Sequence, residues 1–182
     1  MGRPKLVLPW GGTTVLGQVV ATFAAAGIED ILVVTGGARR EVEQLVAQLS
    51  NQYPVRAVYN PEHARGEMLS SIQTGLANLS ASADAALIGL GDQPQVRAIT
   101  IKSICAAYIQ TEAPLVFPSF ENRRGHPWLS SRTFWAEVLE LPQITNPRQF
   151  INGYTGRIEY VQADATILQD LDTPEDYHRQ HP

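Results

Sequence analysis

Hydrophobic positions along the chain follow two alternating spacings, one typical of helices and one typical of buried strands. Apolar residues three or four positions apart predict helices, and short aliphatic or β-branched runs predict strands. The expected helices cover residues 13–26, 40–52, 66–79, 99–110, 131–139, 146–152 and 173–178. The expected strands cover residues 30–35, 55–59, 84–90, 115–118, 125–129, 157–161 and 166–169.

This alternation predicts an α/β fold with a mainly parallel sheet that helices cover on both faces. The 182 residues suit a single domain, and no repeat, low-complexity segment or linker divides them. We therefore expect one domain over residues 1–182, with ligands bound beyond the carboxyl ends of its strands.

Composition narrows the class of protein. A net charge of −4 argues against a non-specific nucleic-acid binder. One cysteine, Cys105, can form neither a disulfide framework nor a cysteine-based zinc site. The sequence shows no apolar run of membrane-spanning length and no signal-peptide core. We expect a cytoplasmic protein with no nucleic-acid or membrane partner.

Asp92 is the first candidate for chemistry. It follows an apolar run, Asp84 to Leu90, and lies in the turn Gly91-Asp92-Gln93-Pro94. A carboxylate at the carboxyl end of a central strand lies at the rim of the ligand crevice, where it can hold Mg²⁺ together with substrate phosphates. Because Asp, Gly and Pro also favour turns for backbone reasons, a purely structural role stays open.

A second acidic cluster lies near the end of the chain, at residues 170–176. Asp170 and Asp172 alternate on an expected extended segment and so face the same side. Asp172 is then a candidate second carboxylate for the metal that Asp92 holds. The alternative is that the cluster only caps and solvates the helix that begins at Thr173 and Pro174.

Two segments are candidates for binding a nucleotide. Gly2-Arg3-Pro4-Lys5 carries two cations that can neutralise phosphate, although a terminus often carries solvated basic residues. The segment Gly66–Ser71 opens an expected helix, where free N–H groups and the hydroxyls of Ser70 and Ser71 could contact a ribose, base or phosphate. Ordinary capping by the two serines is the alternative.

The basic turn Arg123-Arg124-Gly125-His126-Pro127 could bind the phosphate of a second substrate. His126 could equally pack beside Trp128 without a role in binding. The other histidines fit no zinc spacing. The sequence contains neither a G-x-x-x-x-G-K-[ST] phosphate loop nor a G-x-S-x-G turn, so P-loop ATPases and α/β hydrolases are disfavoured.

Six short stretches, in order, resemble the MobA-like nucleotidyltransferases, and especially their molybdenum-cofactor cytidylyltransferase (MocA-like) branch. The stretches are Met1–Trp10, Val33–Gly36, Asn60–Pro61 with Gly66–Ser71, Leu90–Pro94, Arg124–Pro127 and Asp170–Tyr177. The resemblance implies a three-layer, Rossmann-like α/β/α nucleotidyltransferase fold. It also implies attack of an acceptor phosphate on the α-phosphorus of an NTP, with release of pyrophosphate.

The resemblance assigns roles by position. Asp92 and Lys5 would be the catalytic pair, with Lys5 on the NTP phosphates and Mg²⁺ on Asp92 and Asp172. The nucleotide would also contact Gly66, Ser70 and Ser71, and the acceptor would face Arg124 and His126. CTP is favoured as the NTP, and molybdopterin or molybdenum cofactor as the acceptor. A molybdenum hydroxylase is the expected protein partner of an otherwise monomeric chain.

One departure from the family pattern concerns the amino end. Relatives carry a first strand and a Leu-Ala-Ala-Gly-x-Ser-x-Arg phosphate loop directly before the segment that matches Met1–Lys5. Without that strand, sheet edges should be exposed. We expect a start site assigned too late, with a shortened and inactive relative as the alternative. The rival functions are a non-catalytic cofactor-handling protein for molybdenum hydroxylases and a sugar-phosphate nucleotidyltransferase.

Overall fold

The computed structural model describes residues 4–65, 67–142 and 145–182. Its strands are β1 (Pro9–Trp10), β2 (Thr13–Thr14), β3 (Ile31–Thr35), β4 (Val55–Tyr59), β5 (Ala85–Ile88), β6 (Leu115–Phe120), β7 (Arg123–Arg124), β8 (Trp128–Ser131) and β9 (Ile158–Gln162). Its helices are α1 (Val15–Ala25), α2 (Arg39–Leu49), α3 (Glu67–Ala77), α4 (Ala98–Thr111), α5 (Arg132–Glu140), α6 (Pro147–Gly153) and α7 (Pro174–Gln180), with 3-10 turns η1 (Lys5–Val7) and η2 (Ala165–Leu168).

The helices begin and end where the sequence supplies capping groups. The Thr14 side chain accepts a hydrogen bond from the Gly17 N–H and caps α1, and Gly27, with a positive φ, follows the end of that helix. One expected element is wrong, because residues 166–169 do not form a strand. The Asp164 carboxylate accepts from the Thr166 N–H and caps the 3-10 turn η2 instead.

The strands form two separate main sheets. β3 pairs with β4 in parallel, while the larger sheet has the order β5-β8-β6-β7, with β9 parallel to β6. The expected parallel arrangement is interrupted by β8, which runs antiparallel to both β5 and β6. β5 and β6 therefore run in the same direction, and the segments that follow them lie at the same edge of the sheet.

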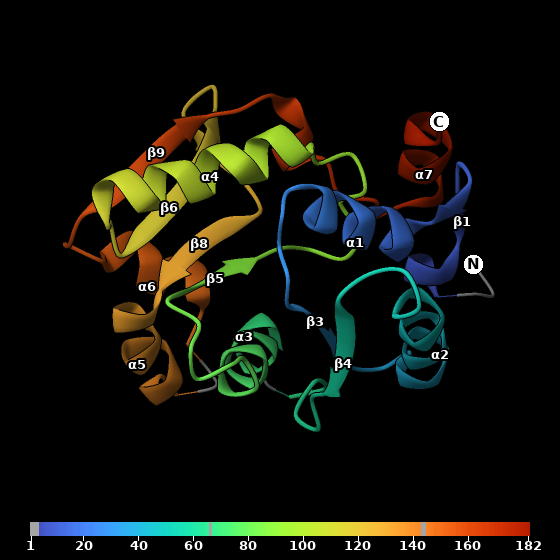
Figure 1. Cartoon of the computed structure of the whole chain (residues 1–182), viewed down its shortest axis with the longest axis horizontal. Helices are drawn as coiled ribbons and strands as arrows, with labels where there is room; N and C mark the ends of the chain where they lie inside the picture. Colours follow the sequence, from blue (N-terminus) through green and yellow to red (C-terminus); the bar gives the residue numbers. More distant parts are fainter. Residues whose placement is uncertain (1–3, 66, 143–144) are drawn as a thin grey trace.

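Helices cover both faces of the larger sheet (Figure 1). On one face, Leu115 of β6 and Phe134 of α5 belong to a buried cluster that α3 completes. On the other face, Val116 of β6 packs with Ile104 of α4. Adjacent β6 residues thus serve opposite layers, as the alternation along a strand requires. This arrangement confirms the α/β/α fold class.

A groove with a volume of about 700 Å³ lies between β3 and β5 and is lined by α1, α3 and α4. Along a strand, successive residues direct their backbone N–H and C=O groups to opposite sides. Those of Leu32 and Val34 in β3, and those of Ala85 and Leu87 in β5, therefore face the groove. The strand sequences are those of buried central strands, yet these four residues are only partly buried. Among the described residues, these backbone groups of β3 and β5 face the groove and not another strand. Within the described residues, no helix has the length and apolar character needed to cross a bilayer.

Candidate functional site

The candidate site lies in the loop that follows β5. After Ile88 the chain passes through Gly89, Leu90 and Gly91 before reaching Asp92. Gly91 allows a close approach, because a Cβ there would lie 3.3 Å from the Leu6 side chain. Leu6 belongs to η1, so this packing brings the neighbouring Lys5 to the carboxyl end of β5.

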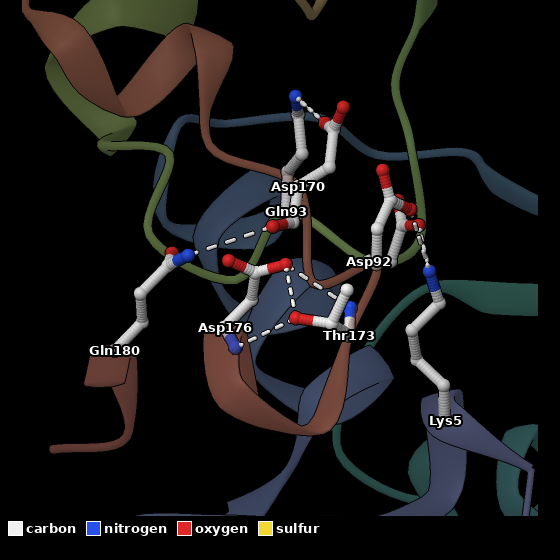
Figure 2. Close-up of polar contacts among 8 residues, drawn as sticks. Lys5, Asp92, Gln93, Asp170, Thr173, Asp176 and Gln180 are labelled. Carbon is white, nitrogen blue, oxygen red and sulfur yellow. Dashed lines mark hydrogen bonds and ion pairs between the residues drawn. The ribbon is translucent and has the colours of Figure 1, made fainter. Parts of the chain in front are cut away.

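Lys5 contacts both of the carboxylates that were expected to meet, and Figure 2 shows its contact with Asp92. Its Nζ lies 2.6 Å from Asp92 Oδ2 and 3.3 Å from Asp172 Oδ1. The Lys5 and Asp92 side chains are 31% and 22% exposed, whereas the Asp172 side chain is 71% exposed. The site therefore has a half-buried ion pair with a second, solvated carboxylate beside it.

The charges of the two carboxylates keep Lys5 protonated. Partial burial by itself lowers the pKa of the Lys5 ammonium, because desolvation disfavours the charged form. Hydrogen bonding and charge attraction from Asp92, and then from Asp172, outweigh that effect and raise the pKa above its ordinary value of 10.5. At neutral pH the ammonium is a permanent cation between two anions.

The carboxy-terminal segment places Asp172. The Leu171 side chain is 1% exposed and packs with Trp10 and Val15, and the Leu171 N–H bonds to the Asp92 carbonyl at 3.3 Å. Thr173 then caps α7 in a reciprocal capping box with Asp176. Asp172 lies between the buried leucine and the cap, so its backbone is fixed although its side chain is exposed.

The neighbouring Asp170 has a different partner. Its Oδ1 accepts a 2.6 Å hydrogen bond from Gln93 Nε2, whereas Asp172 contacts Lys5. Gln93 is 3% exposed and also donates to the Ile167 carbonyl at 3.4 Å. Sequence reasoning missed Gln93, because a glutamine in a glycine- and proline-rich turn normally points to solvent.

Ser70 and Ser71 lie in the first turns of α3, and an asparagine contacts both. Asn60 Nδ2 donates to the Ser70 hydroxyl at 2.8 Å and to the Ser71 hydroxyl at 3.1 Å. The Asn60 N–H bonds to the Thr35 carbonyl at 2.9 Å, so the ends of β3 and β4 are tied to the start of α3. Ser70 is 2% exposed, which leaves Ser71 as the more accessible hydroxyl. Gly66 lies outside the described residues.

Asn60 was noted in the sequence only as part of a matching stretch. Its position directly after an apolar run and before a proline is the signal that could have marked it. The structure shows it to be 1% exposed, and a buried amide in a protein normally has hydrogen-bond partners.

The expected acceptor residues lie at the same edge of the sheet, in the segment after β6. Arg124 donates to the Tyr160 hydroxyl and to Asn152 Oδ1, and its guanidinium lies 5.3 Å from the centre of the Phe117 ring. The His126 N–H bonds to the Ile167 carbonyl at 3.1 Å. Because Gln93 donates to the same carbonyl, one backbone oxygen connects the turn that contains Arg124 and His126 to the Asp92 loop.

The donor set suits a hard divalent cation. The described residues contain no group of three or more His, Cys, Asp or Glu that could hold a metal ion. Asp92 and Asp172 provide two carboxylates that already converge on one cation, the Lys5 ammonium. Mg²⁺ is usually held by one or two carboxylates plus water and substrate phosphates, so two protein ligands are sufficient.

The sheet places two carboxylates and a lysine beyond the carboxyl end of β5, which is where α/β sheets bind their ligands. The comparisons with known proteins make the class specific. The model of the MobA-like NTP transferase domain matches residues 1–160. The chain belongs to this family, and its homology supports nucleotidyl transfer from an NTP as the general activity.

Two curated relatives and one solved structure illustrate the range of similarity. The molybdenum cofactor cytidylyltransferase of Escherichia coli (strain K12) is 27% identical over 180 residues, which is 97% of this chain and 86% of that protein. The nicotine blue oxidoreductase of Paenarthrobacter nicotinovorans is 26% identical over 192 residues, and the match covers 98% of this chain and 89% of that protein. The manganese complex of Rv0371C from Mycobacterium tuberculosis H37Rv matches with a TM-score of 0.79 and 27% identity, and the match covers 98% of this chain and 91% of that chain.

Proposed function

We propose that this protein transfers a nucleotide, CMP in preference, from an NTP to a phosphorylated acceptor of the molybdenum-cofactor type, with Mg²⁺ held by Asp92 and Asp172. The observation that carries the proposal is the convergence of these two carboxylates, from distant parts of the chain, on a single cation. The similarity to a molybdenum cofactor cytidylyltransferase supports the choice of CTP and of the acceptor.

In the proposed reaction an acceptor phosphate oxygen attacks the α-phosphorus of the NTP. The new P–O bond forms as the bond to the β-phosphate breaks, and pyrophosphate leaves with the electron pair of that bond. Lys5 neutralises negative charge on the phosphates, and the backbone around Asp92 orients them, so catalysis is mostly positioning and charge neutralisation. When bound, the divalent ion supplies charge stabilisation at the phosphoryl oxygens.

The acceptor would bind beside Arg124 and His126. Tyr160 and Asn152 hold the Arg124 guanidinium in place, which lowers the entropy that the side chain loses when it binds an anion. A guanidinium matches a phosphate with two parallel N–H donors. The shared Ile167 carbonyl supports this placement, because it ties the turn that contains Arg124 and His126 to the loop that carries Asp92.

A non-catalytic protein that holds a nucleotide or cofactor is the second candidate function. The groove between β3 and β5 favours it, because it reaches Leu6 and Gly91 beside the expected phosphate site, and within the described residues the two strand edges that face it have no partner strand. Such a protein would bind the NTP–metal complex without forming pyrophosphate. Turnover therefore separates the two candidates.

The test measures Mn²⁺ binding by electron paramagnetic resonance and pyrophosphate release from each NTP with an acceptor. We expect Asp92→Asn to abolish Mn²⁺ binding and turnover while the protein stays folded. Asp30→Asn is the matched control, because it removes another aspartate in an ion pair, with Arg56. If Asp92→Asn binds Mn²⁺ as well as the unaltered chain, the metal assignment is wrong. Metal and NTP binding without pyrophosphate release would favour the second candidate.

A further inference from the structure

The two carboxylates of the proposed metal site are held in very different ways. Asp92 is part of a loop packed against η1, and its side chain is mostly buried. Asp172 has a largely exposed side chain whose position depends on the path of residues 170–173. Any contact that fixes this segment against the Asp92 loop therefore sets the separation of the two carboxylates.

Gln93 makes such a contact. It directly follows Asp92, and its Nε2 bonds to the carboxylate of Asp170, two residues before Asp172. The bond spans 77 positions of the chain and links the two metal-binding segments beside their ligands (Figure 2). The acceptor is charged, and such hydrogen bonds are shorter and stronger than neutral ones.

Nearby contacts hold the same segment from other sides. Gln95 Nε2 donates to the Gln180 side chain in α7, and Gln180 Nε2 donates to the Asp170 carbonyl at 3.5 Å. These contacts attach α7 to the loop. The Leu171 N–H also bonds to the Asp92 carbonyl, from the residue next to Asp172. Among the three glutamines, only Gln93 donates to a carboxylate of the acidic segment.

Burial of the Gln93 amide carries an energetic cost. Within the described part of the chain, Gln93 Oε1 has no hydrogen-bond partner although it is buried. A buried polar atom without a partner destabilises a fold, and each such case in a folded protein calls for an explanation. A methionine at this position would fill similar space without that cost, so the role of the amide must come from what its Nε2 holds.

We propose that Gln93 is a positioning residue that, through Asp170, sets the distance between Asp92 and Asp172 for sharing one divalent cation. The inference rests on the proposed function, because it assumes that these two carboxylates bind the metal. Outer partners that orient metal ligands typically change metal affinity by about 10- to 100-fold when they are removed. We expect Gln93→Met to weaken Mn²⁺ binding about tenfold, at the lower end of that range.

The experiment compares Mn²⁺ dissociation constants of the whole chain, without nucleotide, by electron paramagnetic resonance. Gln95→Met is the matched control, because it removes another glutamine of the same loop and its bond to α7 without touching the Asp170 carboxylate. We expect Gln95→Met to bind Mn²⁺ like the unaltered chain. A similar loss in both variants would mean that Gln93 only stabilises the fold, and the proposal would be wrong.

A charge-conserving exchange gives a second, independent measurement. In Gln93→Glu with Asp170→Asn, the new amide donates to the new carboxylate, so the contact is restored with its direction reversed. We expect this double variant to recover Mn²⁺ affinity to within about threefold, a difference well below the 1.4 kcal/mol of a tenfold change. Asp170→Ala removes the contact from the other side and should weaken Mn²⁺ binding about as much as we expect for Gln93→Met. It supplies the same test if the methionine variant does not fold.

The outcomes separate this proposal from the function on which it rests. Unchanged Mn²⁺ binding in Asp92→Asn would refute the metal site itself. Loss of binding in Asp92→Asn together with normal binding in both Gln93→Met and Asp170→Ala would leave the metal site standing and refute the positioning role.

Discussion

Replacing Lys5 by methionine should strengthen metal binding in the absence of nucleotide. The Lys5 ammonium now lies between Asp92 and Asp172, at 2.6 and 3.3 Å. A divalent ion shared by the same two carboxylates must compete with this ammonium for their oxygens. Methionine keeps most of the length of the side chain and removes the charge, so both carboxylates become available.

The size of the effect follows from the exposure of the partners. A hydrogen bond to a charged group contributes about 1.5–3 kcal/mol, while exposed ion pairs contribute about 0–1 kcal/mol. The Lys5–Asp92 pair is partly screened at 31% and 22% exposure, and the contact to Asp172 is weak because that side chain is 71% exposed. We therefore take the Lys5 contacts that the metal ion must displace to be worth about 1.4 kcal/mol. Their removal corresponds to a tenfold tighter Mn²⁺ complex.

The assay is Mn²⁺ titration at neutral pH, first alone and then with CTP. Lys102→Met is the matched control, because Lys102 is an exposed lysine of α4 and its replacement changes the net charge equally. With CTP present the order should reverse, since Lys5→Met loses a phosphate contact and should bind the nucleotide about tenfold more weakly. Mn²⁺ binding that weakens or stays unchanged without nucleotide would refute the competition.

The raised pKa of Lys5 fixes the pH range in which this competition operates. A group whose pKa is higher in the folded protein stabilises the fold fully below its unfolded-state pKa, which is near 10.5. That stabilisation is lost as the pH rises through the folded-state pKa. Between pH 6 and about 9 the ammonium is fully charged, so a change in metal affinity within this range cannot come from deprotonation of Lys5.

Two further predictions test the fold around the site. In Gly125→Ala the new Cβ would collide with the Ile167 carbonyl oxygen, so overpacking should cost about 1–3 kcal/mol and lower the unfolding temperature by several degrees. Gly12→Ala is the control, because a Cβ there meets nothing within 4 Å. Equal unfolding temperatures of the two variants would contradict this. The second prediction concerns an apolar, strand-forming segment of about six residues fused before Pro4, which should fill the groove between β3 and β5. Each buried aliphatic side chain contributes about 1.5–3 kcal/mol. The unfolding temperature should therefore rise above that of a control with a Gly-Ser fusion of equal length. Identical melting curves for the two fusions would show that the groove does not accept a strand.

Hydrophobic spacing predicted most elements because those elements bury one face. β4 was predicted at residues 55–59, as found, and the helix predicted at 99–110 is α4 at 98–111. Residues 166–169 were misassigned because Thr166 and Ile167 have the β-branched character of a strand. A capping contact from Asp164 decided the local structure there, and spacing alone does not encode that contact. Spacing also gives no strand direction, so the antiparallel course of β8 could not be predicted.

The candidate site was predicted in part. The meeting of Asp92 and Asp172 was expected, and the structure brings both to Lys5. Lys5 had been expected on substrate phosphates, and its contact with the two carboxylates was not foreseen, because the partners are 87 and 167 positions away. Gln93 was missed for the related reason that nothing local indicates the burial of its side chain.

The charge balance of these three residues explains why a lysine and two carboxylates suit a site for a triphosphate and a metal. Two carboxylates and one ammonium leave one net negative charge, which attracts a divalent ion and repels a free phosphate group. Once a divalent ion is bound, the balance becomes one net positive charge, and a polyphosphate is attracted instead. Lys5 can then leave the carboxylates for the phosphates without unpairing a partly buried charge, because the metal ion replaces it there. The proposed site therefore favours a nucleotide that arrives with its metal ion, and Mn²⁺ and CTP should each tighten the binding of the other by the same factor.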